Sequence, residues 1–554
     1  MKPQVSLCLI LLAARCGSVD PEPEDGGSDL SPPPDSGLDL DQGVAPRDLG
    51  LGGQDPDAGS MDLGSEASAP LGEEVMTDRG PVRGVVEGST ARFLGIPYAA
   101  APTGALRFRS PEPPTPWTEA RDASSFGPQC PQRSRAGAFV GREDCLQLNV
   151  WAPTQPGPHP VMVWIHGGGY IQGTATLELY DGAPFAARQV VFVSVNYRLG
   201  ALGFLADASL VDEAGTAGNY GLLDQIASLE WVQRNIAAFG GDPAQVTVFG
   251  ESAGGGSVCA LMGMPAADTL FQRGIIQSGG GCTWRPLDRQ GGAQPSAVEI
   301  GARVVTAAAC DRATVAETRA CLRSQSAEDL VAAQFMAGAS ALGLPPLGPN
   351  VDGRHLPSTT VERVQRDEGP RRAVITGSNA DESRSFVTNV DIPDPETYER
   401  VVRAQLGALA ESVLRIYPVG NFSSPKLAYE ALVSDLSFIC PALSFARALS
   451  EAGRPAFTYH FTHTLSGAAA SLGAGHGTEL FPLFEAWDTV RYTPVEADRS
   501  VGEALRRDWT AFAENGAPQG DWAPYPDIRI IASPPASTRN IRQGRCAELS
   551  ALGL

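Results

Sequence analysis

One serine in this sequence lies between two glycines in a pattern that is typical of a catalytic nucleophile. Residues 250–254 read Gly-Glu-Ser-Ala-Gly and directly follow a short apolar run at 246–249. In this pattern a strand turns sharply into a helix, and glycines two residues before and after the serine let the two elements approach closely while the hydroxyl points outward. We therefore predict that Ser252 is the nucleophile of an acyl-transfer reaction.

A serine hydroxyl needs a base to remove its proton, and the sequence has six histidines from which to choose. His476 lies in the glycine-rich stretch 473–477, beyond a predicted strand at 456–461, where a base could reach the serine. We predict that His476 is this base. We expect His159 in a proline-flanked loop, His355 after a turn, and His460 and His463 on or beside a strand to be structural. His460 and His463 have no acidic or cysteine partner at ligand spacing, which argues against a metal site there.

The base needs a carboxylate to orient its imidazole ring. A predicted strand at 373–377 is followed by Asp381 and Glu382, and either could accept a hydrogen bond from the ring N–H. The spacing leaves this choice open. The order of serine, acid and histidine along the chain is the one found in α/β-hydrolases.

A glycine run supplies the remaining part of such a site. Residues 166–170 read His-Gly-Gly-Gly-Tyr at the end of a predicted strand. Backbone N–H groups without neighbouring side chains can converge on a developing oxyanion. A phosphate-binding loop is excluded because no Gly-Lys-Ser/Thr follows.

These residues require a scaffold that places strand ends together. Short apolar strands alternate with helical stretches, and one helix is indicated by Leu222, Ile226, Leu229, Val232 and Ile236 at helical spacing. This alternation predicts an α/β fold with a central, mostly parallel sheet flanked by helices. The predicted strands cover residues 161–166, 190–198, 246–249, 274–278, 373–377 and 456–461.

Longer stretches around these motifs resemble the type B carboxylesterase family, which includes cholinesterases and bile-salt lipases. They are residues 143–151 (EDCLQLNVW), residues 218–225 (GNYGLLDQ) and residues 231–243, which run on to the serine turn. The resemblance extends from about Thr77 to the C-terminus. It implies an α/β-hydrolase fold and a serine carboxylic-ester hydrolase that needs no metal or cofactor.

The resemblance also implies individual roles. It favours Glu382 over Asp381 as the acid, with Ser252 and His476 as its catalytic partners. It implies an oxyanion hole from the N–H groups of Gly168, Gly169 and Ala253. It also implies a supporting serine at Ser278. Two positions depart from the family pattern. Gln147 stands where an aromatic residue or threonine is usual, and Ser383 stands where glycine usually follows the acid.

Eight of the ten cysteines lie beyond the N-terminal region, which fits an oxidising compartment. Their spacing alone allows 105 pairings. The family pattern implies three bridges, namely Cys130–Cys145, Cys310–Cys321 and Cys440–Cys546. The last closes the longest loop and would stabilise the fold by about 4 to 5 kcal/mol in the chain-entropy model. Cys259 and Cys282 remain, either as a fourth bridge or as buried thiols.

Length and charge divide the chain of 554 residues into three parts. Residues 1–16 have the lysine, apolar run and small residues of an export signal. Residues 17–76 carry 15 acidic residues and one basic residue, out of a formal net charge of −21, and are expected to form a disordered acidic linker. Residues 77–554 are expected to form the catalytic domain. The negative charge argues against a nucleic-acid partner.

Cys16 closes the export signal and resembles the lipid-acceptor cysteine of bacterial lipoproteins, although Arg15 stands where a small residue is usual. The chain is therefore expected to be exported, either as an envelope lipoprotein tethered to a membrane through Cys16 or as a freely secreted protein. The sequence leaves the oligomeric state open.

The expected substrate is a small ester without charge. Residues 131–144, where cholinesterases carry a tryptophan for a quaternary ammonium group, contain none, and residues 342–347 are mainly leucine, glycine and proline. Short to medium uncharged carboxylic esters fit best. The alternatives are an amidase or carbamate hydrolase with the same triad, a triacylglycerol lipase, and a surface binding protein without catalysis.

Overall fold

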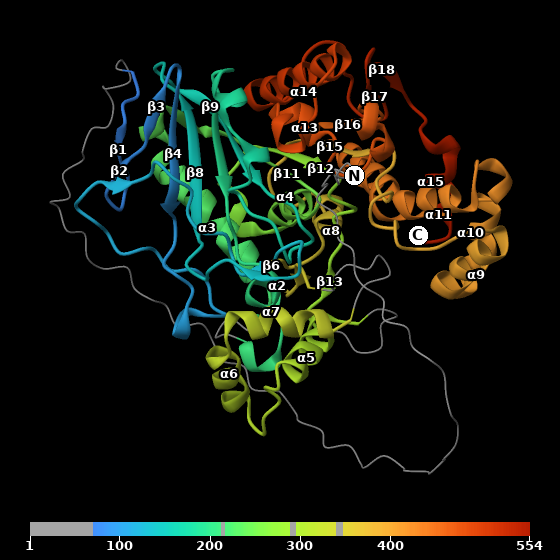
Figure 1. Cartoon of the computed structure of the whole chain (residues 1–554), viewed down its shortest axis with the longest axis horizontal. Coiled ribbons are helices and arrows are strands. Elements are labelled where there is room, and N and C mark those ends of the chain that lie inside the picture. Colours follow the sequence, from blue (N-terminus) through green and yellow to red (C-terminus); the bar gives the residue numbers. More distant parts are fainter. Residues whose placement is uncertain (1–69, 212–215, 289–294, 339–346) are drawn as a thin grey trace, which may run out of the picture.

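The predicted parallel sheet is present in the computed structural model, which describes residues 70–211, 216–288, 295–338 and 347–554 (Figure 1). The export signal, Cys16 and nearly all of the acidic linker lie outside these residues. The main sheet has eleven strands in the order β18-β17-β16-β15-β12-β11-β9-β10-β8-β4-β3. The six strands predicted from the sequence lie side by side in its centre.

These six strands are parallel to one another throughout. They are β9 (His159–Ile165), β10 (Val191–Val195), β11 (Gly241–Glu251), β12 (Arg273–Gln277), β15 (Ala373–Asn379) and β16 (Ala456–Phe461). At one edge β8 (Gln147–Pro153), β4 (Thr90–Pro97) and β3 (Val85–Glu87) pair antiparallel, and at the other β17 (Ile528–Ile531) is parallel and β18 (Ala536–Thr538) antiparallel. The predicted fold class is confirmed.

Alternating side chains of the central strands build two cores, one on each face of the sheet. In β9, Val161 and Val163 belong to one core, together with residues of α3 (Tyr220–Asn235) and α4 (Ala253–Gly263). Trp164 points to the opposite core, where its ring lies 4.9 Å from Phe249 and 5.1 Å from Phe484. This period of two is what a strand buried on both faces requires.

Helices cover both faces, and two further groups of helices lie beyond the sheet, one at the bottom and one at the right of the view (Figure 1). The second core is covered by α1 (Ala183–Ala186), α13 (Leu480–Phe484) and α14 (Glu496–Asn515). One group contains α5 (Ala297–Ala307), α6 (Val315–Ser324) and α7 (Ala327–Met336). The other contains α9 (Pro395–Leu406), α10 (Ala410–Ile416), α11 (Pro425–Ser434) and α15 (Arg545–Ala551) around a small core of its own.

The remaining elements are short or connect these groups. They are α2 (Gly200–Phe204), α8 (Thr360–Gln365), α12 (Cys440–Glu451), β5 (Arg121–Asp122), β6 (Gln132–Arg133), β7 (Phe139–Val140), β13 (Arg285–Pro286) and β14 (Asn350–Val351). Between α11 and α12 the helix passes through a π-helical turn, Asp435–Ile439. Such turns are rare and frequently occur at functional sites.

The ordered fold begins before Thr77, so the predicted boundary of the linker is wrong by several residues. Strand β1 (Glu74–Met76) pairs antiparallel with β2 (Pro81–Arg83), and Val75 is buried in the main core. Strand β1 was not predicted because it is only three residues long and has a single buried residue, Val75, after two glutamates.

Four disulfides join the cysteines of the domain. The structure pairs Cys130 with Cys145, Cys310 with Cys321 and Cys440 with Cys546, as the family pattern implied. It also pairs Cys259 with Cys282, whose Cα atoms are 5.5 Å apart, and this decides the question that the sequence left open. The fourth bridge links α4, which follows Ser252, to the segment that follows Ser278.

Candidate active site

The predicted site residues meet at one edge of the sheet because each follows the carboxyl end of a parallel strand. The glycine run 167–169 follows β9, Ser252 follows β11, and Ser278 follows β12. Glu382 follows β15 and His476 lies in the segment after β16. Residues more than 300 positions apart in the chain are therefore brought to a common place.

Ser252 occupies the sharp turn that its glycines predicted. Its φ of 57° and ψ of −124° lie outside the usual regions for a residue with a side chain, and such conformations cluster at functional sites. A Cβ on Gly250 would lie 2.6 Å from the carbonyl oxygen of Ile165, and one on Gly254 would lie 1.9 Å from the same atom. A Cβ on Gly250 would also lie 2.6 Å from the carbonyl carbon of Gly254, so only glycine lets the turn approach β9 and lets β11 approach α4 this closely.

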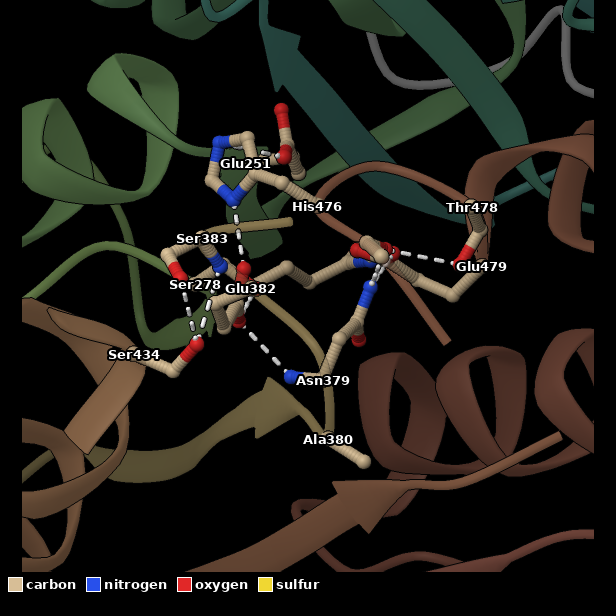
Figure 2. Close-up of polar contacts among 12 residues, drawn as sticks. Glu251, Ser278, Asn379, Ala380, Glu382, Ser383, Ser434, His476, Thr478 and Glu479 are labelled. Carbon is tan, nitrogen blue, oxygen red and sulfur yellow. Dashed lines mark hydrogen bonds and ion pairs between the residues drawn. The ribbon is translucent and has the colours of Figure 1, made fainter. Parts of the chain in front are cut away.

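His476 and Glu382 are in direct contact (Figure 2). Nδ1 of His476 lies 2.6 Å from Oε2 of Glu382, a side chain with no solvent exposure. The other carboxylate oxygen accepts hydrogen bonds from the Ser278 hydroxyl at 2.6 Å and from the backbone N–H of Asn379 at 2.7 Å. Of the two adjacent carboxylates, Glu382 is thus the one that contacts the imidazole ring, and two further donors, on Ser278 and Asn379, hold it there.

The second imidazole nitrogen faces the serine turn. Nε2 of His476 lies 3.1 Å from Oε1 of Glu251, the residue before Ser252, but the two atoms are not aligned as a hydrogen bond. Nε2 makes no hydrogen bond to any residue in the described part of the chain. In the described part of the chain the Ser252 hydroxyl makes no hydrogen bond to Nε2 either, so the serine turn meets the imidazole through Glu251, and Nε2 is free to accept a proton.

Two phenylalanines contact the ring of His476. The centroids of Phe386 and Phe438 lie 5.0 Å and 4.8 Å from the imidazole centroid, and the two phenyl rings stack 5.9 Å apart. Phe438 projects from the π-helical turn Asp435–Ile439, a feature that no spacing in the sequence reveals. These rings restrict the orientation of His476 and shield its contact with Glu382 from water.

Three buried carboxyl groups surround this one imidazole. Besides Glu382 they are Glu251 and Glu479, which accepts hydrogen bonds from the side chains of Asn379 and Gln277. Neither Glu251 nor Glu479 was assigned a role from the sequence, although both are close to predicted catalytic residues along the chain. One imidazolium cannot balance three negative charges in a buried site, so part of the cluster must be neutral.

Burial sets the protonation of the cluster. Removal from water raises the pKa of Glu251 to about 8 and that of Glu479 to about 7. For His476, burial lowers the pKa, but the charges of Glu251 and Glu382 outweigh it and raise the pKa to about 9. The imidazolium form is thus stabilised, and the neutral form, which alone can take the serine proton, is favoured only toward alkaline pH.

A substitution of Glu251 by glutamine tests this electrostatic arrangement. The base must be neutral to act, and loss of a carboxylate 3.1 Å from Nε2 removes an attraction for the imidazolium. The pKa of His476 is expected to fall, so the acid limb of a kcat/KM profile should move to lower pH by about 1 pH unit. The profile is measured between pH 5 and 10, with Glu503→Gln as a control that retains the wild-type limb. An acid limb that stays at the same pH, or moves to higher pH, would contradict this electrostatic arrangement.

The glycine run predicted to form an oxyanion hole lies against the serine turn. A Cβ on Gly167 would lie 3.0 Å from Cβ of Ser252, and Gly168 and Gly169 have φ values of 111° and 63°. Among the described residues, the N–H groups of Gly168 and Gly169 donate to no backbone carbonyl. The Ala253 N–H begins α4 and has no intrahelical acceptor. All three amides can serve a ligand.

The two departures from the family pattern lie outside the contacts between Glu382 and His476. Ser383 donates from its hydroxyl to the carbonyl of Glu430 at 2.7 Å, and its N–H donates to the Ser434 hydroxyl at 2.9 Å (Figure 2). These bonds tie the turn carrying Glu382 to α11. Gln147 begins β8, and its side chain packs against Gly127. A Cβ on Gly127 would overlap the side-chain oxygen of Gln147.

The other predicted structural histidines lie away from this cluster. Nε2 of His159 lies 3.0 Å from the carbonyl oxygen of Gln155, and His460 is buried in β16. His463 contacts Asp498 at 2.7 Å, a partner 35 positions away that sequence spacing could not indicate.

Comparison with known proteins places this arrangement among esterases. The carboxylesterase family profile matches residues 72–540. The para-nitrobenzyl esterase of Bacillus subtilis (strain 168) is 36% identical over 82% of this chain and 92% of its own. The fumonisin B1 esterase of Sphingopyxis macrogoltabida is 35% identical over 81% and 83%. The cholinesterase of Mus musculus is 34% identical over 80% and 79%.

Solved structures show the same similarity in three dimensions. Two structures of PNB esterase match with TM-scores of 0.75 and 0.74, at 32% and 33% sequence identity. Each match covers 86% of this chain and 99% of the other. The predicted α/β-hydrolase fold is confirmed.

Proposed function

The chain belongs to the carboxylesterase family, whose members are serine carboxylic-ester hydrolases, and we propose that it hydrolyses short to medium uncharged esters through an acyl-enzyme on Ser252. One observation carries the assignment of the site. Nδ1 of His476 is held at 2.6 Å by the buried carboxylate of Glu382, while Nε2 is left unpaired toward the serine turn.

The chemistry follows from this geometry. Nε2 of His476 takes the proton of the Ser252 hydroxyl as Oγ attacks the ester carbonyl, and the oxyanion is held by the N–H groups of Gly168, Gly169 and Ala253. Glu382 fixes the imidazole tautomer and stabilises the imidazolium. The proton then passes to the departing alkoxide, and the alcohol leaves. A water molecule, deprotonated by His476, attacks the acyl-enzyme and releases the carboxylic acid.

Aromatic groups beside the nucleophile support an uncharged substrate. The ring of Tyr170 lies 5.1 Å from Phe204 and 6.4 Å from Trp284, and a Cβ on Gly256 in α4 would lie 3.1 Å from the Trp284 ring. Phe386 and Phe438 contact His476, so aromatic rings lie beside both the serine helix and the base, and apolar groups of this kind suit an uncharged ester. Of the leucine- and proline-rich stretch 342–347, on which the sequence-based expectation of an uncharged substrate partly rests, residues 342–346 lie outside the described residues and Leu347 is buried.

Chain-length selectivity tests the proposal. The full chain is assayed on p-nitrophenyl esters with acyl groups of two to twelve carbons, with Ser252→Ala as the control. We expect turnover that depends on Ser252 and is highest for the shorter chains. A maximum at the longest chains would favour a lipase. Folded protein without turnover on any ester would overturn the proposal and direct attention to amides and carbamates.

We also propose that the protein is exported and is tethered through Cys16. Four disulfides in the described domain support an oxidising compartment. Esterase activity is expected in the membrane fraction of cells producing the full chain, and Cys16→Ser should move it to the soluble fraction. Equal distribution of both forms would contradict the tether, and activity retained in the cytosol would contradict export.

A further inference from the structure

We propose that Asp381 is a positioning residue, which holds the loop carrying His476 in register with Glu382. The sequence offered Asp381 only as an alternative acid, and the contact between Glu382 and His476 leaves it without that role. The inference rests on the proposed function of His476 as the base, and it assigns to the adjacent carboxylate a separate task in the same reaction.

Asp381 pairs with the base loop through both its backbone and its side chain. Its N–H donates to the carbonyl of Ala474 at 2.9 Å, and its Oδ2 accepts from the N–H of Ala474 at 3.0 Å. A β-bridge aligns Asp381 with Gly475. One residue further along each segment, Glu382 meets His476. The short pairing therefore sets the distance between the acid and the base.

The base loop needs such support because its own sequence is flexible. Residues 473, 475 and 477 are glycines, and Gly473 and Gly477 have positive φ values of 61° and 74°. Glycine loses more conformational freedom on ordering than any other residue. A Cβ on Gly473 would lie 2.3 Å from Oδ2 of Asp381, so this glycine also makes room for the carboxylate. Asn379 adds a third hydrogen bond to the loop, from its side-chain N–H to the carbonyl of Gly475 at 2.7 Å.

Arg384 directs the carboxylate of Asp381 toward the loop. Its Nη2 lies 3.2 Å from Oδ1 of Asp381, which leaves Oδ2 for the Ala474 N–H. Glu430 lies 3.7 Å from the same guanidinium, on its other side. The Asp381 side chain is 34% exposed, so its truncation opens no large cavity, and the buried Ala474 N–H is the group that loses its acceptor. A change in activity can thus be separated from a change in folding.

The expected effect is on the chemical step. Misplacement of a catalytic group by about 1 Å can lower the rate about 100-fold, whereas substrate contacts elsewhere are unaffected. In Asp381→Ala, kcat should fall about 10- to 100-fold while KM changes less than about threefold. In Asp381→Asn, the amide oxygen can still accept from Ala474, and kcat should stay within about threefold of wild type.

The test uses the full chain and p-nitrophenyl butyrate, with kcat calculated per folded molecule from circular dichroism. Asp527→Ala is the matched control, because Asp527 is similarly exposed and paired with an arginine, Arg539, but makes no contact with the base loop. Wild-type kcat in Asp381→Ala, or equal losses in the alanine and asparagine variants, would overturn the inference.

Two further measurements separate a failure of this inference from a folding defect and from a failure of the proposed function. If Asp381→Ala does not fold, Arg384→Gln decides, since it keeps the carboxylate but releases it from its partner. It should lower kcat about three- to tenfold, and an unchanged kcat would overturn the inference. Absence of Ser252-dependent turnover in the wild-type chain would instead refute the proposed function itself.

Discussion

Replacement of Ser252 by alanine is expected to lower kcat by about 10⁴- to 10⁶-fold, the largest effect of any single substitution in this chain. The reason is that Ser252 alone supplies the atom that becomes bonded to the acyl group. The variant should still fold, because alanine removes only an oxygen from a half-buried turn. The measurement is kcat on p-nitrophenyl butyrate, together with mass spectrometry after treatment with a fluorophosphonate.

The wild-type chain should gain one phosphonyl adduct on Ser252, and the variant should gain none. Ser228→Ala is the matched control, since Ser228 is a buried serine of α3 whose hydroxyl donates to the carbonyl of Gln225 at 2.7 Å. It should keep both activity and labelling. An adduct on another residue, or full activity in Ser252→Ala, would show that a different nucleophile does the chemistry.

Substitution of Glu382 by glutamine is expected to cost about 10⁴-fold in kcat. All three partners of the carboxylate, on His476, Ser278 and Asn379, are hydrogen-bond donors. Glutamine has one acceptor oxygen and one NH₂ group, so it cannot serve all three. If its oxygen serves Ser278 and Asn379, its NH₂ group faces Nδ1 and forces the proton onto Nε2. That tautomer cannot accept a proton from Ser252.

The loss should appear in kcat, with KM and the melting temperature close to the wild-type values. Ser278→Ala provides a graded comparison, because it removes one donor to Glu382 but leaves the contacts with His476 and Asn379. Its loss of kcat should be much smaller than that of Glu382→Gln. Similar losses in the two variants would mean that the network as a whole, rather than the tautomer of His476, limits the reaction.

The elements that hold the site were predictable because their signals are local. Short apolar runs bounded by polar residues indicated β9, β10, β11, β12, β15 and β16, and the structure has all six as neighbouring parallel strands. The turn at Ser252 was predictable for the same reason. Its two glycines are required within five residues of chain, and the close approach to Ile165 shows why.

Other features depend on contacts that no spacing encodes. Asp381 and Glu382 are adjacent in sequence and chemically alike, and the residues alone left either as the acid. Strand β15 and the turn after it point Glu382 toward His476 and Asp381 toward the backbone of Ala474. In the same way, the π-helical turn brings Phe438 to the imidazole ring of His476, 38 positions further along the chain, a contact that the sequence did not predict.

The sequence by itself determined the kinds of chemical groups, their order along the chain and the strand ends that carry them, since these depend on residues within a few positions of one another. Only the tertiary structure decided which carboxylate meets the base, that Cys259 pairs with Cys282, and that Glu251 and Glu479 share the burial of Glu382. These are distances between segments up to about two hundred residues apart, and they exist only once the sheet has brought those segments to one edge.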